Sequence, residues 1–279
     1  MKVLIISPNG GFANRMRTLS AGFLIAELTG RTIYHWWEID NTYHPNECSA
    51  SLNPKKAGLD GYFTLKDCPL APLSNPDICY TEWLPHEYWY SRQSNGQKKW
   101  IPNQLVKYTN TDDILNDNSS IILIESSFIY KPSSIPVDQW QSMLTSAYKR
   151  YFYPLEKYLN LLPNTQYDIG ISIRRNEFLY YFPEANQSMD DIIAWINKMF
   201  KDKSVIIFSD DQSFRDAVRI ATGKLNCIDD ESLEEWEKGF VVFLTLAKCC
   251  NSIYGTPSSS FSFESALFGG RPWHEILHV

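Results

Sequence analysis

Short runs of apolar residues alternate along this chain with longer segments whose apolar positions recur every three or four residues. The short runs predict buried strands and the longer segments predict helices. Strands are expected at residues 2–7, 31–37, 121–125, 169–173, 204–209, 225–228 and 251–254. Helices are expected at residues 14–28, 139–151, 154–161, 189–200, 212–222, 231–248 and 261–268. Because strands and helices alternate, the sequence predicts an α/β protein with parallel, right-handed crossovers.

The middle of the chain departs from this pattern. Residues 38–110 are rich in proline, asparagine, tyrosine and tryptophan and show little periodicity. We expect long loops and short helices there, covering one side of a cleft. The strand–helix pattern resumes in the second half of the chain. We therefore expect two domains, residues 1–160 and 161–279, which pack closely because no low-complexity linker separates them.

Composition places the chain among globular proteins and excludes several function classes. Its 279 residues are 44% hydrophobic and 21% charged, which is ordinary for a soluble protein. The net charge of −6 argues against non-specific binding to nucleic acid or to an anionic membrane. No apolar run is long enough for a signal-peptide core or a membrane span, so we expect a cytoplasmic protein. The six cysteines lack zinc-type spacing, which favours reduced thiols, although a disulfide among Cys48, Cys68 and Cys79 stays open.

Two adjacent arginines follow a predicted buried strand. Ile169, Ile171 and Ile173 alternate with small residues, and Arg174 and Arg175 come directly after them. Strand ends in open α/β sheets lie at the crevice where ligands bind. Two permanent cations there suit an anion with several oxygens, and a diphosphate fits best. The alternative is that acidic side chains on neighbouring loops pair with both arginines.

The loop after the first predicted strand is a second candidate. It contains Gly10 and Gly11, and Asn14 and Arg15 follow at the start of the first helix. The glycines allow the backbone to approach a ligand closely, and the helix N-terminus favours an anion. The alternative is a simple tight turn, because the loop matches neither of the common glycine-rich phosphate motifs.

Two loops of the second domain add hydrogen-bonding groups. Asp210 and Asp211 follow the strand at residues 204–209 and can accept hydrogen bonds from a ribose or a base, or ligate a metal. Asp211 can equally be a helix cap. The last loop opens a helix with hydroxyls and amides that suit a phosphate, or that simply cap the helix; its candidates are Ser258, Ser259, Ser260 and Phe261. Because these loops and the arginines follow strands of one predicted sheet, we expect them to lie together.

Four segments resemble the fucosyltransferase-like superfamily, which includes the NodZ-type and α1,6-fucosyltransferases. They are GGFANRMRTLSAGFLIAELTGR, IRRNE, FSDD and TPSSSFSFESALFGG, near both ends of the chain, whereas residues 38–160 resemble nothing specific. The resemblance implies an α/β, GT-B-like architecture, with two Rossmann-like domains whose parallel sheets face a central cleft. It also implies an inverting, metal-independent glycosyltransferase without a cofactor. Such an enzyme would move a sugar from a nucleotide diphosphate donor, GDP-fucose by resemblance, to a hydroxyl of a glycan acceptor.

The resemblance also implies roles for individual residues. Arg174 would hold the β-phosphate and stabilise the leaving diphosphate. Asp210 or Asp211 would contact the nucleoside. The other implied donor contacts are Gly10, Gly11, Asn14, Arg15, Arg175, Ser258, Ser259, Ser260 and Phe261. The second domain would hold the nucleotide, and the loop with Asn14 and Arg15 would face it from the first domain. The first domain would supply most of the acceptor site.

One position departs from the superfamily pattern. Ser172 stands where members often carry a histidine, two residues before the first arginine. This difference weakens the assignment of fucose more than that of a diphosphate, so a UDP-sugar such as UDP-xylose stays open. An inverting transfer needs a base for the acceptor hydroxyl. Glu177, soon after the arginines, is the first candidate, and Glu38 and Asp40 in the other domain are rivals.

Three other function classes stay open. One is a nucleotide-dependent kinase, which the absence of a P-loop disfavours. A glycosyltransferase of the GT-A type would use Asp210 and Asp211 in a metal-binding motif and would depend on manganese. A non-catalytic carbohydrate-binding protein would explain the aromatic residues around Trp83 and Trp89, which we expect to stack on the sugars of an acceptor. It would not explain two arginines at the end of a strand.

Overall fold

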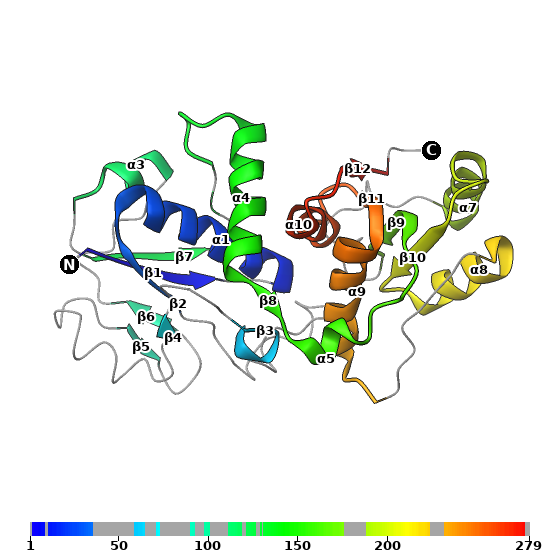
Figure 1. Cartoon of the computed structure of the whole chain (residues 1–279), viewed down its shortest axis with the longest axis horizontal. Helices are drawn as coiled ribbons and strands as arrows, with labels where there is room; N and C mark the ends of the chain where they lie inside the picture. Colours follow the sequence, from blue (N-terminus) through cyan, green and yellow to red (C-terminus); the bar gives the residue numbers. More distant parts are fainter. Residues whose placement is uncertain are drawn as a thin grey trace.

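Two parallel sheets lie side by side along the long axis of the molecule (Figure 1). The computed structural model describes residues 2–8, 11–35, 59–64, 71–72, 90–92, 98–100, 111–118, 121–126, 129, 131–175, 188–223 and 232–276. The first sheet belongs to residues 1–160, called here the first half. The second belongs to residues 161–279, the second half. Parallel strands joined by helices are what the alternating pattern predicted.

The first sheet has the strand order β4-β2-β1-β7, and every pair in it is parallel. Its strands are β1 (Val3–Pro8), β2 (Thr32–His35), β4 (Ala71–Pro72) and β7 (Ile121–Ser126). The longer helices described in this half are α1 (Phe12–Thr29), α3 (Thr111–Asn116) and α4 (Val137–Tyr151). The longest helix, α1, ends at Gly30, whose φ of 62° is the left-handed conformation expected of a terminating glycine.

The second sheet has the order β10-β9-β11-β12 and is also parallel throughout. Its strands are β9 (Tyr167–Ile173), β10 (Val205–Ser209), β11 (Cys250–Gly255) and β12 (Trp273–Glu275). Its helices are α7 (Met189–Met199), α8 (Gln212–Thr222), α9 (Glu235–Cys249) and α10 (Ser260–Gly269). The sequence analysis did not predict β12, and the strand it predicted at residues 225–228 lies outside the described residues.

Strands β9 and β10 of the second sheet are buried along most of their length, which suits their apolar sequences. Ile169, Ile171 and Ile173 of β9 belong to a core with residues of α7 and α8. Ile206 and Ile253 belong instead to the core that contains the apolar residues of α9 and α10. The alternation read from the sequence of β9 therefore corresponds to one real face of the sheet.

The two halves share a core of aromatic rings. The ring of Phe12, at the start of α1, lies 5.5 Å from that of Phe240 and 5.4 Å from that of Phe243, both in α9. The ring of Phe268, in α10, lies 5.9 Å from that of Phe63 and 5.5 Å from that of Tyr148. Pairs at this spacing bury much apolar area. The halves are thus packed together, and a domain boundary near residue 160 stays a prediction.

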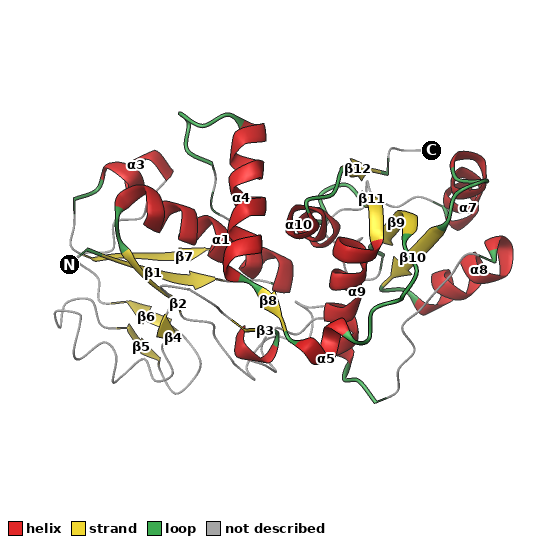
Figure 2. Cartoon of the chain, viewed as in Figure 1, coloured by secondary structure: helices red, strands yellow, loops and turns green. Residues whose placement is uncertain are grey.

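Several short elements lie outside these sheets and their helices, and loops make up the other described positions (Figure 2). They are the 3-10 helix η2 (Leu59–Gly61), strands β3 (Phe63–Thr64), β5 (Tyr90–Arg92), β6 (Lys98–Trp100) and β8 (Tyr153–Pro154), and helix α5 (Glu156–Leu159). The pairs β3–β8 and β5–β6 are antiparallel. Loops and short helices were expected between residues 38 and 110, so the short strands there correct that expectation. Two or three residues are too few to show a strand period.

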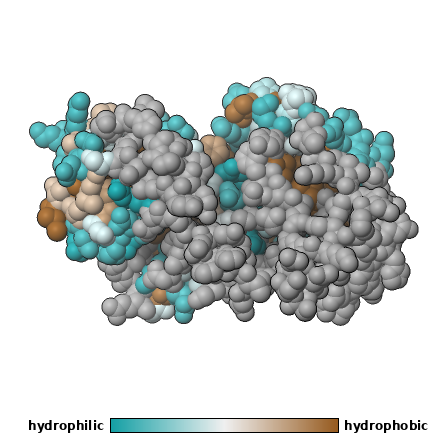
Figure 3. Space-filling model, turned by 180° about the vertical axis from the view of Figure 1, so that it is seen from behind, coloured by the Kyte–Doolittle hydropathy of each residue, from teal (hydrophilic) through white to brown (hydrophobic). Residues whose placement is uncertain are grey.

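The described part of the surface is mainly hydrophilic on the face shown in Figure 3. Among the described residues, the large apolar side chains that are exposed are Leu28, Val137, Tyr153, Met199 and Ile220. No helix within the described ranges is long and apolar enough to cross a membrane.

Candidate functional site

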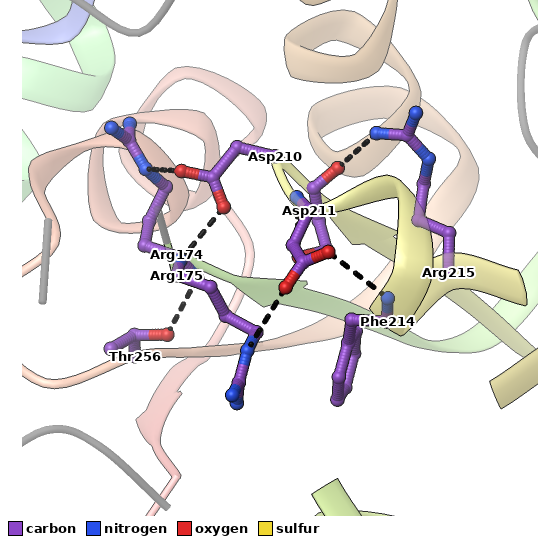
Figure 4. Close-up of polar contacts among 8 residues, drawn as sticks. Arg174, Arg175, Asp210, Asp211, Phe214, Arg215 and Thr256 are labelled. Atoms are coloured by element: carbon purple, nitrogen blue, oxygen red, sulfur yellow. Dashed lines mark hydrogen bonds and ion pairs between the residues drawn. The ribbon is translucent and has the colours of Figure 1, made fainter. Parts of the chain in front are cut away.

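The carboxyl ends of β9, β10 and β11 lie next to one another in the second sheet. Ile173, the last residue of β9, pairs with Ser209 of β10, and Ser172 pairs with Gly255 of β11. The loops that begin at Arg174, Asp210 and Thr256 therefore leave the sheet together. The sequence analysis expected this grouping, and it brings the two arginines and two aspartates into contact (Figure 4).

Arg174 is held by both neighbouring loops. Its Nε donates to Oδ2 of Asp210 at 3.0 Å, and its backbone N–H donates to the hydroxyl oxygen of Thr256 at 2.9 Å. The Asp210 side chain is 5% exposed, whereas that of Arg174 is 23% exposed. Figure 4 shows the terminal nitrogens of Arg174 pointing away from Asp210. The carboxylate thus orients the guanidinium through Nε and leaves its terminal edge directed away from the pair.

Arg175 is enclosed more tightly. Its backbone N–H donates to the second oxygen of Asp210 at 2.7 Å, and its Nε lies 3.4 Å from Oδ2 of Asp211. The guanidinium carbon lies 5.3 Å from the centre of the Phe214 ring, within cation–π range. Both arginines therefore pair with carboxylates, as the alternative interpretation of the sequence expected. Asp210 contacts both arginines.

Asp211 begins helix α8. Its Oδ1 accepts a hydrogen bond from the backbone N–H of Phe214 at 3.1 Å, so it is the N-cap that the sequence analysis considered. Partial burial acts to raise the pKa of Asp211. Hydrogen bonds from Phe214 and Ser213, together with the Arg175 guanidinium, outweigh burial and lower this pKa below its usual value of 3.8. Asp211 is therefore an anion at neutral pH.

The loop from β11 to α10 contains a tight turn. Ser258 has a φ of 63°, the one positive value among the described non-glycine residues, and its side chain is exposed. The N–H of Ser259 donates to the carbonyl of Thr256 at 3.1 Å, which closes the turn. A Cβ at Gly255 would lie 1.9 Å from the hydroxyl oxygen of Ser262, so only glycine fits there. Ser260 and Phe261 then open α10, whose first N–H groups favour a negative charge.

The corresponding loop of the first half precedes α1. Gly11 is the N-cap of α1 and has open space around its Cα, since an added Cβ would meet nothing within 4 Å. Asn14 is half-buried, whereas Arg15 is only 1% exposed. The Arg15 side chain is thus almost wholly shielded from solvent. A donor contact through Arg15 stays a prediction.

No family model matches the sequence, and no curated protein matches it significantly. Solved structures do match its fold. NodZ α-1,6-fucosyltransferase soaked with GDP-fucose superimposes with a TM-score of 0.59 and 13% identity, covering 96% of this chain and 92% of that one. An Arabidopsis thaliana FUT1 mutant in complex with GDP gives 0.62 and 15%, covering 100% and 70%. POFUT1 in complex with GDP-fucose gives 0.59 and 12%, covering 99% and 98%.

The chain has a fucosyltransferase-like fold. This confirms the resemblance inferred from four short segments, although identities of 12–15% lie below the range in which function can be transferred with the fold. It also confirms the predicted fold class, an α/β protein with Rossmann-like parallel sheets of the GT-B kind.

Within this fucosyltransferase-like fold, the described candidates fall into three groups. Arg174, Arg175, Asp210 and Asp211 are in mutual contact at one end of the second sheet. Ser258, Ser259, Ser260 and Phe261 lie in the turn before α10 and at its start. Gly11, Asn14 and Arg15 lie at the start of α1. The remaining predicted residues lie outside the described part of the chain; they are Gly10, Glu38, Asp40, Trp83, Trp89 and Glu177.

Two side chains of this site, Phe214 and Arg215, were not singled out from the sequence, and Thr256 was expected only as part of a phosphate-binding loop. The Thr256 hydroxyl ties the last loop to Arg174. The Phe214 ring covers Arg175, and Nη1 of Arg215 donates to the carbonyl of Ser209 at 2.6 Å. The signal for the last two was their position, three and four residues after Asp211. On a helix that Asp211 caps, these positions return toward the loop.

The described residues contain no group of three or more histidine, cysteine, aspartate or glutamate side chains placed to hold a metal. Asp210 and Asp211, the candidate metal ligands of the GT-A alternative, direct oxygens at Arg174 and Arg175. The GT-A alternative required a different fold and is not supported by the structural matches. Metal independence itself stays a prediction.

Proposed function

We propose that the chain is a glycosyltransferase that uses a GDP-sugar, GDP-fucose by resemblance, and transfers the sugar to a hydroxyl of a glycan acceptor. One observation carries the proposal. Arg174 lies at the carboxyl end of β9, oriented by Asp210 and Thr256, in a fold shared with enzymes whose structures contain GDP or GDP-fucose. An arginine held in this way is a preorganised cation for a diphosphate.

In the proposed reaction, negative charge develops on the leaving diphosphate, and groups of the site would stabilise that charge. The bond between the anomeric carbon of the sugar and a β-phosphate oxygen breaks, and the electron pair leaves with the diphosphate. The guanidinium of Arg174 stabilises the growing charge on the leaving oxygens. The N–H groups at the start of α10, near Ser260 and Phe261, add a second source of positive potential. Such groups act without reorganisation during the reaction and supply much of the catalysis.

The acceptor hydroxyl forms the new bond to the anomeric carbon from the opposite face, which inverts the configuration there. Its proton passes to a base, and Glu177 is the first candidate, with Glu38 and Asp40 as rivals. Because Arg174 supplies a positive charge to the leaving diphosphate, we propose that no divalent cation is needed. Ser258, which is exposed in the loop before α10, is a candidate contact for the diphosphate. Asp211 is a candidate contact for the nucleoside.

A thermal-shift screen tests this proposal. GDP-sugars and UDP-sugars are added to the protein in excess EDTA, and a ligand that binds the folded chain raises the melting temperature by mass action. We expect GDP and GDP-fucose to raise it without metal. A shift with UDP-sugars alone would replace the donor in the proposal. A shift that appears only when manganese replaces EDTA would contradict metal independence. If no nucleotide shifts the melting temperature under either condition, the proposed function is contradicted.

A further inference from the structure

A buried ion pair joins the two halves of the molecule close to the proposed donor site. The Glu264 side chain, in α10, is 0% exposed. One of its oxygens accepts a hydrogen bond from Nε of Arg17 in α1 at 2.6 Å. The other accepts from the hydroxyl of Tyr148 in α4, also at 2.6 Å. Helix α10 belongs to the second half, and α1 and α4 belong to the first, so both bonds cross between the halves.

The pair lies one turn from the start of two helices that open with candidate donor loops. Residues three or four apart on a helix share a face. Arg17 follows Asn14 by three residues in α1, and Glu264 follows Ser260 by four in α10. The ion pair therefore joins the same faces that, one turn earlier, carry the candidate donor residues of each half.

Apolar packing alone would hold the two halves together at a lower cost in desolvation free energy. The surrounding aromatic rings already bury a continuous core across the interface. A buried carboxylate loses its hydration, and burial accordingly raises the pKa of Glu264 against the opposing effects of Arg17 and Tyr148. A charge buried at this cost, with one directional donor for each oxygen, fixes geometry more strictly than rings can.

We propose that Glu264 is a positioning residue that holds the N-terminal turns of α1 and α10 at a fixed spacing, so that both halves contribute to one donor site. This inference rests on the proposed function, since it concerns the same nucleotide. It assigns a role to a residue whose carboxylate bonds Arg17 and Tyr148, neither of which is a candidate donor contact. It also predicts that the two helix starts do not move independently when the nucleotide binds.

The chain offers a matched control. Glu27, at the other end of α1, also accepts from an arginine and a tyrosine, namely Arg150 at 2.5 Å and Tyr151. Both partners lie in α4, so this cluster stays within the first half, and Glu27 is 38% exposed there. Both Glu27→Gln and Glu264→Gln thus remove a negative charge that faces an arginine and a tyrosine. Glu264 lies near the helix starts, and Glu27 lies far from them.

Titration calorimetry with GDP compares wild type, Glu264→Gln, Tyr148→Phe and Glu27→Gln at a temperature where circular dichroism shows all to be folded. We expect Glu264→Gln to raise the Kd for GDP at least about fivefold, the low end of couplings between linked sites. Tyr148→Phe keeps the ion pair and should raise the Kd less. Glu27→Gln should bind as wild type does. Deuterium uptake at residues 11–18 and 256–263, measured without nucleotide, should rise in Glu264→Gln and not in Glu27→Gln.

The outcomes separate the two proposals. If wild type binds no GDP, the proposed donor is wrong, and deuterium uptake still decides the role of Glu264. If Glu264→Gln has a lower melting temperature but wild-type affinity and unchanged uptake at both helix starts, the residue serves stability only and the inference is overturned. Should Glu264→Gln not fold, Tyr148→Phe decides in its place, because a GDP affinity and uptake equal to those of wild type would also overturn the inference.

Discussion

Arg174 and Asp210 form the best-defined unit of the proposed site. The carboxylate of Asp210 is nearly buried, and its two oxygens accept from Nε of Arg174 and the backbone N–H of Arg175. A planar guanidinium held through Nε has few orientations left to lose when a diphosphate arrives. We therefore distinguish Arg174, proposed to touch the reacting diphosphate, from Asp210, proposed to act through Arg174.

Replacing Arg174 by lysine keeps the charge but removes the fork of donors. We expect kcat/KM for donor consumption to fall. The expected loss of transition-state stabilisation is about 2.7–4 kcal/mol, the range for loss of one oxyanion donor. The measurement is the release of nucleotide diphosphate from the sugar donor. Arg219→Lys is the control, because Arg219 pairs with Asp216 on the surface of α8. Near-wild-type turnover in a folded Arg174→Lys protein would remove Arg174 from the mechanism.

Asp210→Asn tests positioning at the same place. The asparagine side chain has the same size, but its amide nitrogen cannot accept a hydrogen bond, so one of the two bonds to the arginines is lost. We expect kcat to fall, with a rise in activation free energy of about 1.5–3 kcal/mol, the range for a hydrogen bond to a charged group. The donor KM should change less. Asp216→Asn is the surface control. An equal loss of kcat in both variants, or no loss in either, would show that Asp210 does not orient Arg174.

At the scale of elements, the site is built from starts of helices that follow parallel strands. Helix α8 begins with a charged cap at Asp211, and α10 begins after the turn that contains Ser258. The close fit of Gly170 shows how tightly these elements pack, since an added Cβ there would lie 2.6 Å from the sulfur of Cys250. Helix starts held against a rigid sheet keep their N–H groups directed at one place.

The cap of α8 makes stability depend on pH. The pKa of Asp211 is lowered in the folded chain, so its charge stabilises folding above the unfolded value of 3.8, and this contribution is lost as the pH falls through the folded pKa. Asn caps a helix about as well as Asp but does not titrate. We expect wild type to melt at a higher temperature than Asp211→Asn at neutral pH. The difference should vanish in acid below 3.8. A difference that is constant with pH would contradict a charge effect.

The elements themselves could largely be predicted. Ile169, Ile171 and Ile173 gave a strand because one face of β9 meets α7 and α8. Helix α8 was predicted with its observed ends, because an aspartate cap and a terminating glycine mark them. The three-residue strand β12 was missed, since so short a segment has no readable period. Pairs such as Arg17 with Glu264 join residues 247 positions apart, and periodicity within one element carries no information about such a contact.

At the scale of the whole molecule, we propose that one half supplies most of the nucleotide contacts and the other half supplies most of the acceptor contacts. The arginines, the aspartates and the β11–α10 loop all belong to the second half, which is the proposed nucleotide side. The first half, through residues 36–100, is the proposed acceptor side. The shared aromatic core and the Glu264 ion pair hold the halves together.

Two kinds of variant separate these sides. Asp211→Ala should weaken nucleotide binding, because it removes a cap and a proposed nucleoside contact. Trp83→Ala or Trp89→Ala should leave nucleotide affinity unchanged and raise the acceptor KM, which is the effect of losing uniform binding. Calorimetric titration of the nucleotide and acceptor kinetics measure the two effects. Loss of nucleotide affinity in the tryptophan variants, with none in Asp211→Ala, would mean that the sides are assigned the wrong way round.

The most direct test of the central claim is titration of GDP into the wild-type chain and Arg174→Lys in excess EDTA. The account predicts that wild type binds GDP without metal and that Arg174→Lys binds it about tenfold or more weakly, which corresponds to ~1.4 kcal/mol of lost interaction. Arg219→Lys should bind as wild type does. Absence of GDP binding to the folded wild-type chain, or equal affinity in Arg174→Lys, would contradict the account.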